Sequence, residues 1–456
     1  MFRPWVDPAE VRAAGVRLRE QTPAETHAHH EPAGSRPDPV HEVERVNTGR
    51  LRELTAVRVG RMVSSPFAFL RGSAGLMAAD LAATPITGVA AQICGDAHAA
   101  NFGLYASPER RLVMDVNDFD ETVRGPWEWD LKRLAASIVV AGRESGVGAE
   151  QCRSAARDCA VTYRAALREM AGMPVLEAWY LTTDHNTLEH FNIGDLTATF
   201  DRVRKKAKKN TSRKVAAKFT QRIERDEWRF VPEPPILTPV PDDVAEEVVD
   251  GLEDYAEQLH PELRYLLSRF SIEDVAARVV GLGSVGLRSY VVLLHGNGED
   301  ALVMQVKEAR SSAVAPYLPA GFPVYSGHDG QRIVQGQQWM QTVSDILLGW
   351  TTIGGREFLV RQFRDMKGSI DPATLKPDEL DDYARVVGAV LARAHGDSAD
   401  PRLLSGYCDG TDAADGVAFD AAIAGFAARY ADQTERDHAA LLGAVRAGRI
   451  PATFDI

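Results

Sequence analysis

The chain has 456 residues, of which 45% are hydrophobic and 25% charged, a composition typical of globular proteins and not of disordered or fibrous ones. A formal net charge of −12 argues against a general nucleic-acid binder, because affinity for a phosphate backbone needs a basic surface. The length exceeds that of one ordinary core and predicts two or three domains or lobes.

No targeting or membrane signal is visible in the sequence. The start, MFRPWVDPAEVRAAG, lacks a positive region followed by an apolar run, and no apolar stretch approaches the roughly 20 residues that span a bilayer. The cysteines show no metal-binding spacing and no disulfide framework: Cys94, Cys152, Cys159 and Cys408. We therefore expect a cytoplasmic protein with reduced thiols and no membrane contact.

Residues 1–48 are rich in Pro, His, Glu and Arg and contain HAHHEP at His27 to Pro32. Three histidines can bind a transition metal, but a solvated extension is the better interpretation of so polar a segment.

A predicted hairpin follows, with strand-like runs at 101–105 and 111–116 on either side of a Ser-Pro-Glu turn. Polar residues stand before its first strand and after its second: Asp96, His98, Asn101, Asp115, Asp118, Asp120, Glu121 and Asp130. Functional groups would then project from loops held on rigid backbone. Asp130 also begins a helical run, DLKRLAASIVVAGRE, where it is a candidate N-cap.

The spacing of these residues indicates phosphate chemistry. Asp96 and Asn101 have the D-x-x-x-x-N spacing of a phosphotransferase catalytic loop, in which the Asp orients or deprotonates the attacking hydroxyl and the Asn binds a metal. Asp118 follows the hairpin where a kinase places a second metal-binding Asp. Mg²⁺ prefers such oxygen ligands. Asp120 is a further candidate ligand, and which of Asp115, Asp118 and Asp120 binds metal stays open.

The basic run at 202–218 holds nine Lys or Arg and no acid. It could attract an anionic substrate or form a solvated helix face, and both interpretations stay open. Five prolines between Phe230 and Asp243 then predict an extended connector at a lobe boundary.

A second constellation lies in RVVGLGSVGLRSYVVLLHGNGEDALVMQVKEA, which reads as strand, glycine-rich turn, strand, hairpin turn and third strand. Rossmann binding would require a helix after the glycines, where the strand-like YVVLL stands. A glycine loop between two strands, with a lysine on the next strand, is what a kinase uses to cover phosphates. The predicted phosphate-binding residues are Gly281, Gly283, Ser284, Gly286 and Lys307. The alternative for Lys307 is a position in solvent.

Two resemblances follow from these motifs. GDAHAAN resembles the G-D-x-H-x-x-N loop of aminoglycoside and choline phosphotransferases, and DFDETVRGPWEWDL resembles their D-F-x-D...G-P...D-L segment. GDAHAANFG, NDFDE, QVKEA and RQFRDMKGS are together similar to a large bacterial family known as a domain of unknown function, over roughly residues 50 to 440. The first resemblance implies a two-lobed, protein-kinase-like α+β fold with ATP and Mg²⁺ as cofactors. It also implies that Asp96 and His98 belong to a catalytic loop that Asp130 braces.

The kinase-like elements stand in an unusual order, because the acidic segment at 94–131 precedes the glycine loop and lysine at 281–307. A circular permutation would explain this order. We expect a small antiparallel-sheet lobe and a larger, mainly helical lobe. The predicted division is a polar extension at 1–48, a helical lobe with the catalytic and metal loops at 49–250, a β-rich nucleotide-binding lobe at 251–370, and completing helices at 371–456.

Three departures from the phosphotransferase pattern stand out. Cys94 occupies a place where the resembling loops carry His. The helix predicted at 331–348 offers Gln335 and Gln337 where a kinase has a Glu to pair with its lysine, which leaves Glu308 or Asp345 as substitutes. The HGD sequence at 395–397 lacks an Asn five residues after its Asp, so it is interpreted as a helix end.

The leading hypothesis is an ATP- and Mg²⁺-dependent phosphotransferase, or a nucleotidyl transferase, acting on an unidentified small-molecule or protein hydroxyl. One alternative is a metal-dependent phosphoesterase with Asp96 and His98 as ligands. That site needs further histidines, and the candidates are His185, His190, His295 and His395. Another alternative is a catalytically inactive, nucleotide-binding regulator, which the glutamines favour. The sequence indicates neither the acceptor nor an oligomeric state.

Overall fold

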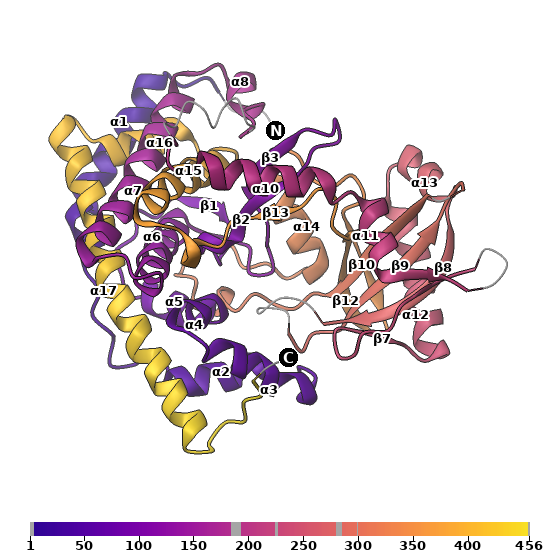
Figure 1. The fold of residues 1–456 in the computed structure, drawn as a ribbon. Helices are drawn as coiled ribbons and strands as arrows, with labels where there is room; N and C mark the ends of the chain where they lie inside the picture. Colours follow the sequence, from indigo (N-terminus) through magenta and orange to yellow (C-terminus); the bar gives the residue numbers. More distant parts are fainter. Residues whose placement is uncertain (1–3, 184–192, 224–226, 280–284, 299, 455–456) are drawn as a thin grey trace.

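The computed structural model describes residues 4–183, 193–223, 227–279, 285–298 and 300–454. A sheet-rich part lies at one end and a larger helical part at the other, with a short hairpin between them (Figure 1). The predicted α+β class, with a smaller β part and a larger helical part, is confirmed.

The longer described helices are α1 (Pro8–Gln21), α2 (Pro39–Asn47), α3 (Arg52–Met62), α4 (Pro66–Gly72), α5 (Ala74–Leu81), α6 (Trp127–Glu144), α7 (Ala149–Gly172), α8 (Val175–Trp179), α10 (Thr197–Lys209), α11 (Ser212–Phe219), α12 (Asp242–Gln258), α13 (Pro261–Leu267), α14 (Asp329–Met340), α15 (Pro377–Gly396), α16 (Pro401–Asp409) and α17 (Ala413–Arg446). The described strands are β1 (Ala90–Ile93), β2 (Phe102–Ala106), β3 (Leu112–Val116), β4 (Val123–Pro126), β5 (Thr220–Arg222), β6 (Trp228–Phe230), β7 (Leu237–Pro239), β8 (Ser271–Arg278), β9 (Ser289–His295), β10 (Ala301–Glu308), β11 (Gly349–Ile353), β12 (Arg356–Gln362) and β13 (Gly368–Ser369).

The sheet-rich part is a six-stranded antiparallel sheet in the order β11-β12-β10-β9-β8-β7. The three strands predicted around the glycine turn are confirmed as β8, β9 and β10. Alternate residues of these strands face opposite sides, so α12 packs on Met304 and α11 packs on Val303. The predicted connector at 230–243 contributes the edge strand β7. The boundary predicted at 250 falls inside α12, which packs on this sheet.

The predicted hairpin is confirmed as β2 and β3, which pair in antiparallel register from Phe102 opposite Val116 to Ala106 opposite Leu112. The short strand β13 adds to the other edge of β2. Because β13 follows β12 after a short connector, the central hairpin is tied directly to the six-stranded sheet.

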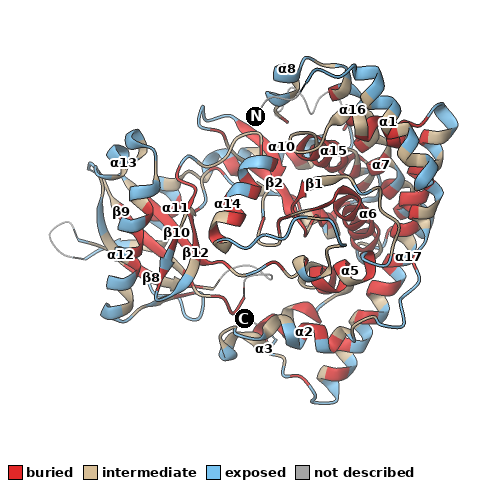
Figure 2. Cartoon of the chain, turned by 180° about the vertical axis from the view of Figure 1, so that it is seen from behind, coloured by how far each residue is buried: buried red, intermediate tan, exposed pale blue. Residues whose placement is uncertain are grey.

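The helical part is built around α6, which is buried almost along its whole length (Figure 2). Helices α7, α15 and α17 pack around it, and α15 and α17 lie in the range 371–456 where completing helices were expected. Helix α14 ends at Met340 and not at Leu348 as predicted. Carboxylates accept the following backbone N–H groups, Asp115 from Thr342 and Asp345 from Leu347, and so replace the helical hydrogen bonds.

The N-terminal segment is packed against the helical part, so the prediction of a solvated extension is wrong. His27 is fully buried and its Nε2 lies 2.6 Å from the hydroxyl of Tyr407. Arg36 binds Asp80 and Asp437, each at 2.6 Å. A guanidinium held between two buried carboxylates fixes this segment to α5 and α17.

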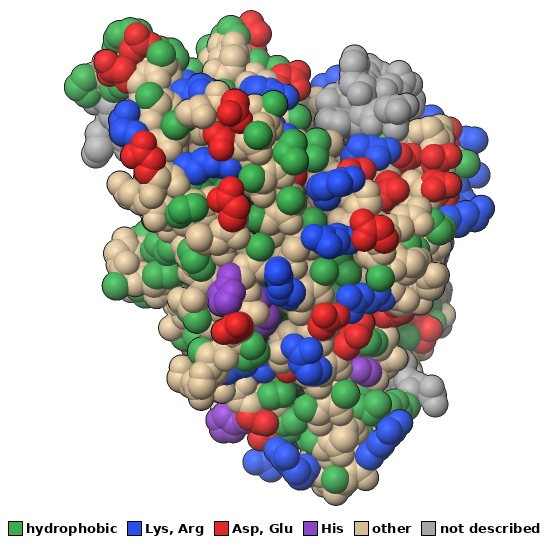
Figure 3. Space-filling model, turned by 90° about the vertical axis from the view of Figure 1, so that its left-hand side faces the viewer, with side chains coloured by type: hydrophobic (Ala, Val, Ile, Leu, Met, Phe, Trp, Pro, Cys, Tyr) green, Lys and Arg blue, Asp and Glu red, His purple; other side chains and the backbone are tan. Residues whose placement is uncertain are grey.

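The four cysteines are free and buried, as predicted for reduced thiols. No helix in the described part of the chain combines the length and apolar character that a bilayer crossing needs. On the face of the helical part seen in Figure 3, Lys and Arg side chains alternate with Asp and Glu.

Candidate functional site

The loop that precedes β2 is held by Asp130, as predicted. Its Oδ2 accepts the N–H of Cys94 at 2.7 Å and its Oδ1 accepts that of Gly95 at 3.0 Å. The N-cap prediction for Asp130 is wrong, because α6 begins at Trp127 and Asp130 lies in its first turn. Gly95 has φ +74°, and a Cβ there would lie 2.3 Å from the carbonyl oxygen of Glu121. Only glycine therefore allows this loop to approach the segment after β3 so closely.

Asp96 projects from this loop, and its two carboxylate oxygens have different surroundings. Its Oδ1 accepts the Nε–H of Arg133 at 2.7 Å, and Arg133 is 2% exposed. Its Oδ2 lies 3.8 Å from Nε2 of His98. Burial lowers the pKa of His98 to about 4, so its ring is neutral at ordinary pH. Asp96 is thus an oriented carboxylate with Oδ2 available to a hydroxyl.

Asn101 joins the two acidic segments. Its Nδ2 donates to the backbone carbonyls of Asp96 at 3.2 Å and Asp118 at 3.0 Å. Because these bonds use both amide hydrogens, Oδ1 is the side-chain atom that can bind a cation.

Asp118 and Asp120 follow β3 and meet Lys307 of β10. Lys307 is 2% exposed and its Nζ pairs with Oδ2 of Asp120. Asp118 is exposed to the cavities; desolvation by their walls would raise its pKa, but Lys307 and Arg361 lower it to about 2. Burial and the neighbouring Asp118 raise the pKa of Asp120. The pKa of Asp118 is thus the lower of the two.

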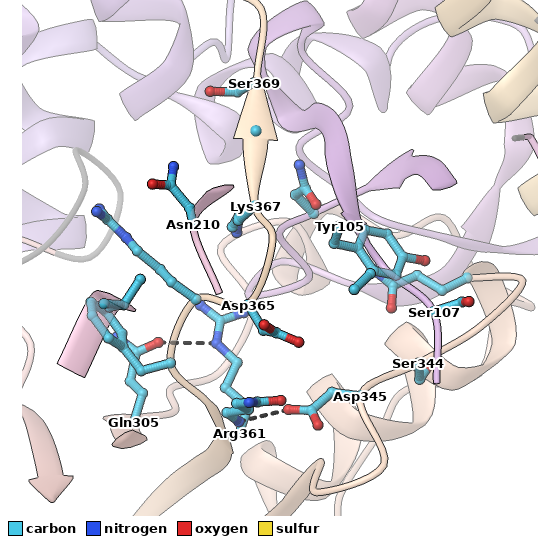
Figure 4. A pocket seen from close by; sticks show the side chains of 18 of the residues that line it. Tyr105, Ser107, Asn210, Gln305, Ser344, Asp345, Arg361, Asp365, Lys367 and Ser369 are labelled. Carbon is cyan, nitrogen blue, oxygen red and sulfur yellow. Dashed lines mark hydrogen bonds between the residues drawn. The ribbon is translucent and has the colours of Figure 1, made fainter. Parts of the chain in front are cut away.

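Two cavities meet at Asp118. The larger, of about 890 Å³, lies between the six-stranded sheet and the β2–β3 hairpin and is lined by Lys307, Arg361 and Lys367. The smaller, of about 500 Å³, is lined by Asp96, Asp120 and Glu121 together with Asp118. We call them the basic cavity and the Asp96 cavity. Figure 4 shows Arg361 and Lys367 at the basic cavity, with the 3.0 Å hydrogen bond from Arg361 to Gln305 dashed.

The glycine-rich turn is described only in part. Gly281, Gly283 and Ser284 lie outside the described residues. Gly286 has φ +88°, and its carbonyl accepts the N–H of Leu51 at 2.8 Å. The next residue, Leu287, lines the Asp96 cavity. The C-terminal end of the turn therefore borders the site.

Several other candidates are already engaged by protein contacts or lie away from the cavities. Asp115 is 1% exposed and pairs with Arg393 at 3.0 Å, which excludes it from the metal role left open by the sequence. Glu308 pairs with Arg288 at 3.3 Å and Asp345 accepts backbone N–H groups, so neither replaces the kinase Glu. His98 lines neither cavity.

Three cations at the site were not among the sequence candidates: Arg133, Arg361 and Lys367. Arg361 and Lys367 lie in RQFRDMKGS, a segment noted above only for its family resemblance. Arg133 comes three residues after Asp130 on α6. Residues three apart lie on the same side of a helix, so this spacing is the signal in the sequence that would have placed Arg133 beside the loop that Asp130 braces.

The donor set at Asp118 fits Mg²⁺ and not a softer metal. Mg²⁺ is usually held by one or two carboxylates together with phosphate oxygens and water. Asp118 borders both cavities and can provide one protein oxygen, whereas Asn101 is 3% exposed and lines neither cavity, and Asp120 is already paired with Lys307. Among the described residues, no group of three or more His, Cys, Asp or Glu is arranged to hold a metal ion. Two of the histidines considered for a hydrolase, His185 and His190, lie outside the described residues.

A protein-family profile described as "Uncharacterized protein conserved in bacteria (DUF2252)" matches residues 50–444. No curated protein and no solved structure shows significant similarity to the chain. The match covers most of the sequence, including Asp96, Asp118 and Lys307, which line the cavities. The chain therefore belongs to the DUF2252 family of uncharacterised bacterial proteins.

Proposed function

We propose that this protein is an ATP- and Mg²⁺-dependent phosphotransferase of kinase-like architecture that acts on a hydroxyl acceptor. The observation that carries the proposal is the meeting of Lys307 with Asp118 and Asp120 between two adjoining cavities. A lysine beside ionised carboxylates, next to a separately held Asp, is the set of groups that phosphoryl transfer uses.

The arrangement of the sheet supports a permuted kinase-like fold. Counted from the strand before the glycine turn, β10 is the third strand and carries Lys307, and helix α14 follows it. A kinase places its lysine on the third strand after a glycine loop, before a helix. The loop of Asp96 comes earlier in the chain yet borders the same site, and chain order matters less than spatial arrangement.

The two cavities suggest which substrate occupies each. The basic cavity would hold the nucleotide, with its phosphates toward Lys307 and Asp118. The acceptor hydroxyl would lie in the Asp96 cavity, within reach of Asp96 Oδ2. Its oxygen forms a bond to the γ-phosphorus, the bond from that phosphorus to the β,γ-bridging oxygen breaks, and Asp96 accepts the hydroxyl proton. Mg²⁺ would neutralise phosphate charge, and Asp118 would hold it.

Replacing Asp96 tests this assignment. Asp96→Asn should lower Mg²⁺-dependent conversion of ATP to ADP, measured with a panel of hydroxyl metabolites, by about 10²- to 10⁴-fold. ATP affinity should be unchanged, because Asp96 acts on the hydroxyl. Glu109→Gln, at the exposed tip of the β2–β3 hairpin, is the matched control. Full activity of Asp96→Asn would remove Asp96 from the mechanism, and absence of ATP binding in the unchanged protein would refute the proposal.

A nucleotide-binding regulator without turnover is the second candidate. The observation that favours it is Gln337, a buried glutamine on α14 at the basic cavity where a kinase helix has a Glu. Lys307 then takes its carboxylate from Asp120. ATP binding without ADP formation over the whole acceptor panel would select this candidate. Tightly bound Mn, Fe or Zn in the purified protein would instead indicate a phosphoesterase.

A further inference from the structure

The basic cavity carries more positive charge than the protein as a whole would suggest. Eight Lys or Arg side chains line it, against three carboxylates: Arg110, Arg202, Lys206, Lys218, Lys307, Arg361, Arg364 and Lys367 against Asp118, Asp345 and Asp365. The chain has a net charge of −12, so this concentration of cations is local. Clustered like charges repel, and the cost of holding them together is relieved when an anion binds.

The basic run at 202–218 supplies one wall of this cavity. It forms α10 and α11, and Arg202, Lys206 and Lys218 line the cavity whereas Lys205, Lys208, Lys209 and Lys214 do not. Helix α10 is oriented by Val203 and Ala207, which lie against Gly368 of β13. Arg202 and Lys206 are therefore presented on one face, about 6 Å apart along the axis. We call Arg202, Lys206 and Lys218 the basic wall.

Two lysines of the basic wall lack an acidic partner. Neither Lys206 nor Lys218 forms an ion pair with any residue in the described part of the chain. Arg202 donates only to the hydroxyl of Thr199, at 3.3 Å. All three wall residues are exposed, so what distinguishes them from the other lysines of α10 and α11 is that they line the basic cavity, where they can bind an anion.

Lys218 of the basic wall and Lys307 lie toward different ends of β10. Next to Lys218, Phe219 has its ring 6.4 Å from that of Phe363, whose N–H donates to the carbonyl of Val303. Val303 and Lys307 are four residues apart on β10, which corresponds to about 13 Å along the strand. The cavity of about 890 Å³ that both lysines line is larger than one phosphate group needs. We infer that the ligand of the basic cavity carries a second anionic group, which the basic wall binds.

This inference takes one element from the proposed function, namely that a nucleotide occupies the basic cavity. The second anion would be a phosphate on the ribose of the nucleotide or an anion on a separate molecule. Binding of two adenosine compounds by calorimetry, without metal or turnover, distinguishes these sources. Adenosine 3′,5′-bisphosphate should bind about tenfold tighter than AMP to the full-length protein, because it offers the wall a charge-assisted contact. If added inorganic phosphate instead tightens AMP binding, the second anion comes from a separate molecule.

The wall variant carries Lys206→Ala together with Lys218→Ala. It should abolish the tighter binding of the bisphosphate relative to AMP, or the tightening of AMP binding by inorganic phosphate. The control is Lys208→Ala with Lys214→Ala, which removes the same charge from exposed positions of the same helices that do not line the cavity. The control should keep the gain. The inference is overturned if the gain survives in the wall variant, or if neither compound shows a gain in the unchanged protein. Wall-dependent binding in a protein that transfers no phosphate would refute the proposed function alone.

Discussion

Lys307 on β10 forms an ion pair with Asp120, which lies 187 positions earlier in the chain. The lysine side chain is 3% exposed and that of Asp120 is 24% exposed, so the pair is largely shielded from water. It joins the six-stranded sheet to the loop after the central hairpin. The pair also brings a cation to the carboxylates that border both cavities.

We predict that Lys307→Met weakens ATP binding at least tenfold, because it removes a cation from the proposed phosphate site. The same change leaves Asp120 without its partner and should lower the free energy of unfolding by about 3 kcal/mol. Calorimetry and urea unfolding measure the two effects. Lys307→Arg keeps the charge and should retain most of the affinity. Unchanged ATP binding by Lys307→Met would show that Lys307 does not contact phosphate.

Asp130 gives a prediction about the catalytic loop. Asp130→Ala leaves the buried N–H groups of Cys94 and Gly95 without acceptors, at about 1–3 kcal/mol for each group. Stability to urea should fall, and turnover should fall further because Asp96 loses its support. Asp130→Asn keeps one acceptor oxygen, so its stability and turnover should lie between those of the unchanged protein and of Asp130→Ala. Wild-type stability in Asp130→Ala would contradict the bracing role.

The sequence predicted the parts of the site that depend on local spacing. The hairpin and the three strands around the glycine turn follow from short patterns, whereas the bracing role of Asp130 came from the phosphotransferase resemblance, and the structure contains each of them. Local spacing could not distinguish among the candidate metal-binding acids, because their tertiary contacts differ. Asp115 has the same local character as Asp118, yet it faces Arg393, which is 278 positions away.

The N-terminal segment shows where prediction from composition fails. Its polar composition predicted solvation, but His27 is buried and Arg36 is partly buried against residues some four hundred positions later. A buried arginine is indistinguishable from an exposed one in a sequence, because burial depends on distant carboxylates that pair with it. The basic run is an intermediate case. Helical spacing shows which lysines share a face, and only the fold shows that this face lines a cavity.

Arg36 provides a direct test of that packing. Arg36→Ala leaves the buried carboxylates of Asp80 and Asp437 without their shared cation, so the free energy of unfolding should fall by about 3–5 kcal/mol. Urea unfolding followed by circular dichroism measures the change. Arg17→Ala, at an exposed position of α1, should change stability little. Equal stability of the two variants would contradict the packing of this segment.

The affinity of the basic cavity for phosphates should depend on pH through Lys367. Lys367 is an exposed residue that lines the basic cavity, where desolvation by the cavity walls, reinforced by Arg361, lowers its pKa to about 8. A bound phosphate favours the charged ammonium and raises that pKa, so ATP should bind fully below pH 8 and more weakly as the pH rises above it. Calorimetry at pH 7 and 9, about one unit on either side of that pKa, should also show proton uptake on binding near pH 8. Lys367→Arg stays charged at both values and should lose this dependence. If the unchanged protein binds ATP equally at both pH values, Lys367 makes no contact with the phosphates.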